Sequence, residues 1–172
     1  MRQHIQLTCG MIASSKSTYA LSAAKKGFVI VNDDSLSQSI HGGDYTLYDK
    51  TCTPIYKAVG ISILTHALTI GKSVVVDVGN RKRHIRQRWI ALAHMFDVPS
   101  YAIVFPKEVP EVHARRRYDS DHRGISFEKW LEVARRHDLD WQPVLCDQEG
   151  FKDVIDVHWP QVSSGWVFVP GD

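Results

Sequence analysis

The chain has 172 residues and an ordinary charged fraction of 23%, which suits one α/β domain with a full core and argues against a disordered chain. Its net charge of +2 does not by itself mark a nucleic-acid-binding protein. Cys9, Cys52 and Cys146 show no C-x-x-C spacing, which argues against a zinc motif and a disulfide framework. No apolar run is long enough to span a bilayer and no leader peptide begins the chain, so we expect a reduced, cytoplasmic setting.

Residues 3–9 are predicted to form the first strand, and the loop after it carries Lys16-Ser17-Thr18 six residues after Gly10. This spacing matches a phosphate-binding loop, in which backbone N–H groups and a helix N-terminus hold nucleotide phosphates. Lys16 would contact the β- and γ-phosphates, and the Ser17 hydroxyl would ligate Mg²⁺. The residues expected to bind the nucleotide here are Gly10, Ala13, Ser14, Ser15, Lys16, Ser17 and Thr18.

One position of this loop departs from the usual G-x-x-x-x-G-K-S/T pattern, because Ser15 replaces the second glycine. A glycine there lets the backbone approach the phosphates in a conformation that other residues disfavour. Ala13 also stands where a glycine is expected. The motif alone therefore permits two interpretations, a phosphate-binding loop and a polar loop before an ordinary helix.

A helix is predicted over residues 16–26, and the apolar run 28–31 after it indicates a buried parallel strand. Asp33 and Asp34 follow this strand directly. Since ligands of open α/β sheets bind beyond the carboxyl ends of strands, these carboxylates are expected near the phosphate-binding loop. We expect Asp34 to face the site; the alternative is that both carboxylates cap a short helix beginning near Ser35. Residues 35–53 are predicted to be loop with a short helix.

A helix is predicted over residues 54–70 and a buried strand over 73–77, which ends in Asp77. Asp77 is a candidate to hold a Mg²⁺-bound water or to orient an acceptor. Asn80 is predicted to be the N-cap of the next helix, whose beginning is basic over residues 81–88. Because cations at a helix N-terminus oppose the helix dipole, this placement favours an anionic partner such as a nucleic-acid backbone. The alternative is an ordinary solvated basic face.

The second half of the chain continues the alternation of strands and helices. The elements predicted there are a strand over 99–105, a helix from Pro110 to about Tyr118, a helix capped by Ser126, a fifth strand over 143–146 and a candidate short strand at 167–169 in the tail. This alternation predicts an α/β fold with a doubly wound parallel sheet of about five strands and helices on both faces. We expect the strand order 2-3-1-4-5 and a single domain over residues 1–172.

The segment 27–34 followed by Gln38-Ser39-Ile40 resembles the corresponding segment of phage-type polynucleotide 5′-kinases, which are P-loop phosphotransferases. At the level of motif order the resemblance covers roughly residues 4–140, including the strand ending in Asp77 and the arginine-rich segment 115–123. It implies a P-loop kinase fold with an arginine-rich lid at residues 112–125, ATP as phosphate donor and Mg²⁺ as cofactor. It also implies a nucleic-acid substrate and the cytoplasm of an infected bacterial host if the chain is phage-encoded. We expect no membrane or protein partner.

Carried over residue by residue, the resemblance implies that Asp34 is the general base, while Lys16 and Arg123 offset charge on the transferring phosphate. Arg117 would bind the nucleotide. The acceptor-binding residues implied are Asp77, Asn80, Arg81 and Arg83, and the metal ligand is Ser17. The family has an arginine between its base and the Gln-Ser-Ile segment, where this chain has Ser37. Because of that departure, the resemblance does not fix the identity of the acceptor.

Three functions are therefore weighed. The first is an ATP-dependent kinase that phosphorylates a hydroxyl of a nucleic acid, in the first place the 5′-hydroxyl end of DNA or RNA. The second is a P-loop kinase with another acceptor, either a hydroxymethylated pyrimidine base in phage DNA or a free nucleoside or nucleotide. The third is a non-catalytic module that binds nucleotide or nucleic acid.

Overall fold

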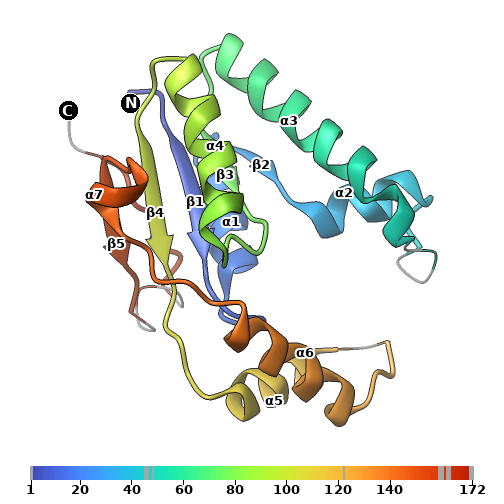
Figure 1. Ribbon diagram of the computed structural model, residues 1–172. Helices are drawn as coiled ribbons and strands as arrows, with labels where there is room; N and C mark the ends of the chain where they lie inside the picture. Colours follow the sequence, from blue (N-terminus) through green and yellow to red (C-terminus); the bar gives the residue numbers. More distant parts are fainter. Residues whose placement is uncertain are drawn as a thin grey trace.

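The computed structural model describes residues 2–44, 47, 49–121, 123–158, 161 and 164–170. Parallel strands form one five-stranded sheet in the order β2-β3-β1-β4-β5 (Figure 1). The strands are β1 (Ile5–Cys9), β2 (Val29–Val31), β3 (Val74–Val76), β4 (Ser100–Val104) and β5 (Asp153–Asp156). The predicted doubly wound fold and the predicted strand order are both confirmed.

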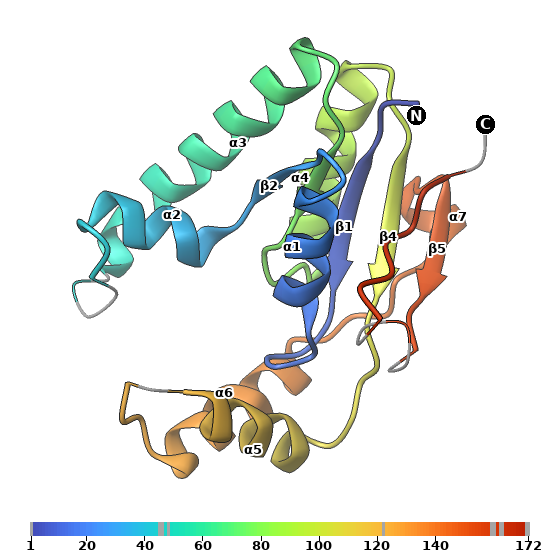
Figure 2. The same cartoon turned by 180° about the vertical axis from the view of Figure 1, so that it is seen from behind.

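Helices cover both faces of the sheet: α3 (Thr53–Thr69) and α4 (Arg83–Met95) lie on one face, and α1 (Lys16–Ala24) lies on the other (Figures 1 and 2). A hairpin of two further helices lies beyond the ends of the strands, at the edge to which their arrows point. The hairpin consists of α5 (Pro110–Ser120) and α6 (Phe127–Leu139), and the remaining described helices are α2 (Asp33–Ile40), the 3-10 helix η2 (Lys50–Cys52) and α7 (Cys146–Glu149). No described helix has both the length and the apolar character that crossing a bilayer requires.

The main core consists of two apolar layers, one on each face of the sheet, and a third, smaller cluster lies in the α5–α6 hairpin. On one face Leu7 packs with Leu64 of α3 and Ile90 of α4, and on the other Tyr19 of α1 packs with Phe105. The strand β3 is fully buried, in keeping with its uninterrupted apolar sequence. Burial on both faces leaves the ends of the strands as the place where polar side chains gather.

The C-terminal tail packs against the face that carries α1, but residues 167–169 are not the strand that the sequence analysis considered. The Gln6 side-chain amide donates a hydrogen bond to the Phe168 carbonyl at 2.8 Å. The Tyr19 hydroxyl donates to the side-chain Oε1 of Gln6 at 2.6 Å and accepts from the Phe168 N–H at 3.2 Å. These bonds hold the tail through polar side chains rather than through a strand ladder.

The predicted fifth strand at 143–146 is wrong, because the strand that pairs with β4 is β5, at Asp153–Asp156. β5 lies at the edge of the sheet, where its two terminal aspartates are exposed. Its only apolar residues are Val154 and Ile155, so its hydrophobic signal is weak in the sequence. Cys146 instead begins the short helix α7.

The prediction that Asn80 caps the next helix is also wrong. α4 begins at Arg83, with Lys82 in the N-cap position. Asn80 lies in the left-handed region with φ of 33°, which asparagine tolerates better than most residues. Its side-chain amide is buried and donates to the carbonyls of Thr8 and Val76, each at 3.0 Å. Asn80 therefore ties the turn after β3 to the ends of two adjacent strands.

The basic beginning of α4 is not a free cationic face. Arg86 is fully buried, and its guanidinium contacts both carboxylate oxygens of Glu149 at 2.7 Å. The same guanidinium donates to four carbonyl oxygens, which belong to Asn80, Arg81, Gln142 and Pro143. Lys82 pairs with Asp140 at 2.8 Å, and Arg83 donates to the Gln148 carbonyl. Internal partners thus engage several of the cations that the sequence analysis offered to a nucleic acid.

The Arg86–Glu149 pair yields a stability prediction. Glu149→Ala should lower the free energy of unfolding by about 3 to 5 kcal/mol, because it leaves a buried guanidinium without its counter-charge. Urea unfolding of the two proteins measures this difference. The exposed Asp147→Ala on the same helix is the control and should change stability by less than about 0.5 kcal/mol. Equal stability of Glu149→Ala and the parent protein would contradict this account.

Candidate active site

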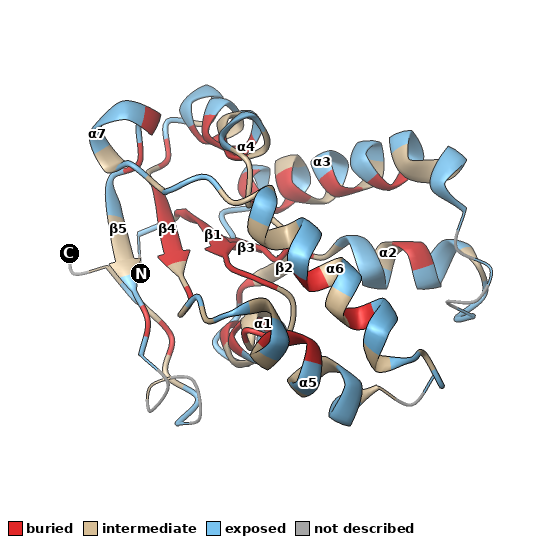
Figure 3. Cartoon of the chain, turned by 60° about the horizontal axis from the view of Figure 1, so that its bottom comes forward, coloured by how far each residue is buried: buried red, intermediate tan, exposed pale blue. Residues whose placement is uncertain are grey.

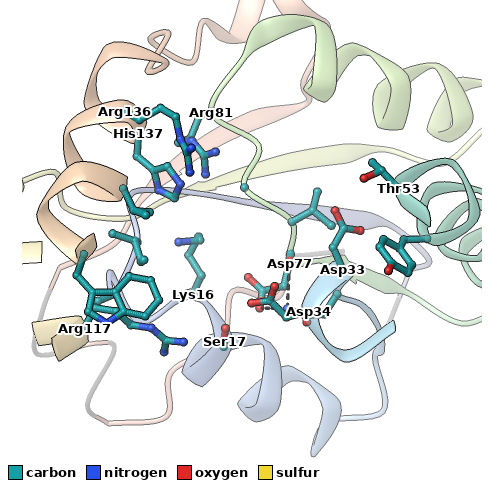
Figure 4. A pocket seen from close by; sticks show the side chains of 18 of the residues that line it. Lys16, Ser17, Asp33, Asp34, Thr53, Asp77, Arg81, Arg117, Arg136 and His137 are labelled. Carbon is teal, nitrogen blue, oxygen red and sulfur yellow. Dashed lines mark hydrogen bonds between the residues drawn. The ribbon is translucent and has the colours of Figure 1, made fainter. Parts of the chain in front are cut away.

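A pocket of about 520 Å³ lies at the carboxyl edge of the sheet, between the sheet and the α5–α6 hairpin. Figure 3 shows this end of the molecule, with α6 and α5 beside the tips of the strands and α2. Its walls come from the loop after β1, the first turn of α2, the turn after β3, the beginning of α3 and the hairpin. Five segments distant in sequence therefore meet at one cavity (Figure 4).

The loop after β1 has the backbone that the glycine pattern anticipates, although the glycines are replaced. Ser15 adopts φ of 69° and Ala13 φ of 51°, both in the left-handed region that favours glycine. Gly10 has no space for a side chain, because a Cβ there would lie 2.6 Å from Ser14 Oγ and 3.0 Å from Phe105 Cβ. Ser14 is buried, and its hydroxyl donates to the Met11 carbonyl at 2.9 Å. The substituted sequence therefore keeps a tight turn that leads into α1.

Lys16 opens α1, and its side chain enters the pocket (Figure 4). Its ammonium donates to the Met11 carbonyl and to Ser14 Oγ. Burial lowers the pKa of Lys16 to about 8 against the opposing influence of the Asp77 carboxylate. Ser17 also lines the pocket, whereas Gly10, Ser14, Ser15 and Thr18 form the loop and the helix start without lining it. The expected Lys16–Ser17 pair is thus brought to the cavity.

A second wall carries three carboxylates. Asp77, at the end of β3, is 5% exposed and accepts hydrogen bonds at 2.9 Å from the Thr8 hydroxyl and from the Asn32 amide. The side-chain oxygen of Asn32 caps α2, because it accepts a hydrogen bond from the Ser35 N–H at 2.8 Å. Asn32 therefore fixes the first turn of α2, which contains Asp33 and Asp34, against Asp77. The cap is Asn32 rather than either aspartate.

Both aspartates of that turn line the pocket, Asp34 as expected and Asp33 in addition. Figure 4 shows Asp34 beside Asp77 and near Ser17, while Asp33 points toward Thr53. Burial, followed by the charge of Asp34, raises the pKa of Asp33. The two neighbouring carboxylates thus have different surroundings, and Asp34 is the one adjacent to the phosphate-binding loop.

The hairpin contributes Arg117 from the last turn of α5 and Arg123 from the connection between α5 and α6. Arg117 and Arg123 line the pocket and lie over the Trp130 ring, with guanidinium carbons 5.0 and 5.3 Å from its centroid. Arg123 also pairs with Asp121 at 2.7 Å. Arg115 instead stacks on Phe127 at 4.4 Å, away from the cavity. The structure therefore brings the two arginines singled out in the sequence to the site.

The sequence analysis missed a further group of pocket residues on α6. Trp130, Val133, Arg136 and His137 recur at helical spacing on the face of α6 that lines the cavity. Two of them, Arg136 and His137, gather with Arg81 on one wall (Figure 4). Tyr56 and Thr53 of α3 were missed as well.

Not every acceptor residue implied by the resemblance reaches the pocket. Asp77 and Arg81 line it, whereas Asn80 is buried beneath it and Arg83 does not line it. Ser37, which stands at the acceptor arginine of the resembling kinases, is also buried, at 1% exposure. The Ser37 side chain therefore does not line the pocket.

A parallel sheet in this order, with a lysine-bearing turn between its first strand and first helix, defines the P-loop kinase-like fold. The chain belongs to the family described as AAA domain, whose model matches residues 5–139. No curated protein matches it in sequence.

Solved structures share the fold at low identity. A candidate kinase from Chloroflexus aurantiacus is 17% identical, with a TM-score of 0.66 and coverage of 95% of this chain and 91% of that one. A gluconokinase from Sinorhizobium meliloti is 15% identical, with a TM-score of 0.55 and coverage of 95% and 86%. Kti12 from Chaetomium thermophilum, in complex with ADP-AlF3, is 14% identical, with a TM-score of 0.57 and coverage of 93% and 94%. The predicted fold is confirmed, and the closer resemblance to polynucleotide 5′-kinases stays a prediction.

The backbone of Ser15 yields a prediction on stability. Ser15→Gly should raise the free energy of unfolding by about 0.5 to 1 kcal/mol, because the relief of a left-handed conformation exceeds the added freedom of the unfolded chain. Thermal and urea unfolding measure the change. Ala24→Gly, in the exposed last turn of α1, should do the opposite by a similar amount. Destabilisation by both substitutions would show that Ser15 is not strained.

Proposed function

We propose that this protein is an ATP-dependent kinase that transfers the γ-phosphate to a hydroxyl of a small-molecule acceptor, with a free nucleoside or nucleotide as the first class to test. The observation that carries the proposal is the convergence of Lys16 and Asp34 on one pocket of about 520 Å³. That volume is ordinary for a small-molecule site. The name of the similar gluconokinase supports an acceptor of this size.

The loop after β1, the hairpin arginines and the carboxylates each have a role in phosphoryl transfer. Lys16 and the N–H groups at the start of α1 would bind the β- and γ-phosphates. Arg117 and Arg123 would offset the charge that spreads over the transferring group. Asp34 would accept the proton of the attacking hydroxyl, and Asp77 would orient the acceptor or a bound water. Positioning and charge neutralisation supply most of what this reaction needs.

The residues present fit a magnesium ion. The Ser17 hydroxyl and the Asp77 carboxylate supply oxygen donors on one side of the pocket (Figure 4). Among the described residues, no group of three or more histidine, cysteine or acidic side chains could hold a metal. Mg²⁺ ordinarily binds through one or two protein oxygens together with substrate phosphates, and when bound it would neutralise charge between the β- and γ-phosphates.

The internal partners of the basic residues favour a small acceptor over the end of a nucleic acid. Internal partners engage Lys82, Arg83 and Arg86, so the beginning of α4 offers less free positive charge to a phosphate backbone than its sequence suggests. The buried Ser37 cannot replace the acceptor arginine of polynucleotide 5′-kinases. The 5′ end of DNA or RNA and a hydroxymethylated pyrimidine in DNA are therefore competing acceptors for the assay.

The assay uses ATP labelled at the γ-phosphate with Mg²⁺ and four acceptor classes: nucleosides, nucleoside monophosphates, 5′-hydroxyl oligonucleotides and DNA containing hydroxymethylated pyrimidines. Label should move to a small acceptor. Asp34→Asn should lower kcat by roughly 10²- to 10⁴-fold, because the general base is lost. Asp147→Asn, exposed on α7, is the matched control and should keep full activity.

Three results would contradict the proposal. Transfer to oligonucleotides alone would return the acceptor to the end of a nucleic acid. Full activity of Asp34→Asn would remove the assignment of the base. A protein that binds ATP but labels nothing in a wider panel would be a binding module.

The pKa of Lys16 also predicts the pH dependence of ATP binding. Phosphate stabilises the protonated ammonium, so affinity should be constant below about pH 8 and fall by up to ~10-fold per unit above it. Calorimetric titration from about pH 7 to about 9.5 measures this fall. In Lys16→Arg the guanidinium stays charged over this range, so the slope should vanish. A parent protein with unchanged affinity throughout would refute a role for Lys16 in binding the phosphates.

A further inference from the structure

Three basic side chains form a cluster on the pocket wall opposite the carboxylates, and the proposed transfer reaction leaves them without a role. Arg81 comes from the turn after β3, and Arg136 and His137 come from the end of α6. Figure 4 shows the three side chains together, on the other side of Lys16 from Arg117 and Ser17. We call this group the Arg81–Arg136 cluster.

The turn after β3 is built to direct Arg81 into the cavity. A Cβ on Gly79 would collide with the Arg81 guanidinium, so the side chain folds closely over that glycine. The left-handed Asn80 makes the turn, and its amide fastens it to β1 and β3. The buried Arg86 holds the carbonyls of Asn80 and Arg81 at 3.1 Å. Arg81 is thus held in position before any ligand arrives.

The cluster lacks an internal counter-charge. Among the described residues neither Arg81 nor Arg136 forms an ion pair, and Arg81 Nε and His137 Nδ1 are buried without hydrogen-bond partners. The carboxylate that influences both Arg81 and His137 is Asp140, which pairs with Lys82. Burial and the nearby Arg81 lower the pKa of His137 to about 3, so its imidazole is neutral and adds no charge. The buried Nε of the half-buried Arg81 belongs to a charged group without an ion pair, which indicates a site that an anion completes. The exposed Arg136 adds a second positive charge at the same wall.

The position of the cluster decides which anion that is. The triphosphate already has Lys16, the turn at the start of α1, and the two hairpin arginines on one side of the pocket. The acceptor hydroxyl must approach Asp34 from the remaining space, which Arg81 and Arg136 border. We propose that the Arg81–Arg136 cluster binds an anionic group, a phosphate or a carboxylate, on the acceptor, so that the substrate is a small anionic hydroxyl compound. This inference rests on the proposed kinase function.

The test compares acceptors that share a hydroxyl and differ in one anionic group: thymidine against thymidine 5′-monophosphate, both scored at the 3′-hydroxyl, for phosphate, and sorbitol against gluconate for carboxylate. In each productive pair the anionic member should have the higher kcat/KM, by at least roughly 100-fold. Arg81→Gln should raise its KM by roughly 30- to 100-fold and leave the KM for ATP nearly unchanged. Arg81→Lys, which keeps the charge, should restore part of the loss. The pair that responds distinguishes phosphate from carboxylate.

Two other variants separate the cluster from general effects. Gly79→Ala should displace the Arg81 guanidinium and therefore act like Arg81→Gln. Arg88→Gln, on an exposed part of α4 outside the pocket, is the control and should behave like the parent protein. Thermal unfolding of every variant checks that the fold is intact.

The outcomes distinguish a failure of the proposed anion site from a failure of the proposed kinase function. Equal use of the neutral and anionic members would leave the kinase in place and overturn the anion site. A rise in the KM for ATP with Arg81→Gln would assign the cluster to the donor and overturn it too. If no acceptor is phosphorylated, the proposed function fails, and calorimetric binding of thymidine 5′-monophosphate and gluconate in the presence of ADP still decides the site. Binding that Arg81→Gln abolishes supports it, and no binding overturns it.

Discussion

The buried guanidinium of Arg86 is the constraint on which the pocket depends. It joins α4 to α7 through Glu149 and holds the carbonyls of two segments, the turn after β3 and the chain returning from the hairpin. A guanidinium can do this because it presents five N–H donors in one plane. Removing its charge from water is unfavourable, and the carboxylate together with the carbonyls offsets that. The walls that carry Arg81 and α6 are therefore attached to the same point.

The phosphate-binding loop shows that a backbone conformation can persist when its customary residues are replaced. Ser15 and Ala13 occupy left-handed conformations that glycine would adopt without strain. Neighbouring contacts hold them there: Gly10 admits the close approach of Ser14, and the Ser14 hydroxyl and the Lys16 ammonium both donate to the Met11 carbonyl. Strain of this kind is commonly retained at functional sites, where the surrounding structure over-determines the conformation.

The pocket separates its charges by wall. Carboxylates lie where β2 and β3 end, arginines project from the hairpin and from the turn after β3, and Lys16 stands between them (Figure 4). Asn32 connects this arrangement to the fold, because one side chain both bonds Asp77 and caps α2. A substrate that is anionic at one end and carries a hydroxyl at the other would match such a division of charge.

The sequence by itself determined the features that depend on neighbouring residues. The apolar runs before Asp33 and Asp77 predicted buried parallel strands, and the ends of such strands share one edge, so the meeting of Lys16, Asp34 and Asp77 was predictable. Only the tertiary structure decided which polar residues would be buried. Arg86 and Asn80 look like surface residues until distant partners, Glu149 and the ends of β1 and β3, enclose them. The edge strand β5 was missed because an exposed strand needs few apolar residues. Arg136 and His137 were missed because the hairpin is placed at the carboxyl edge of the sheet by long-range contacts, which local periodicity does not record.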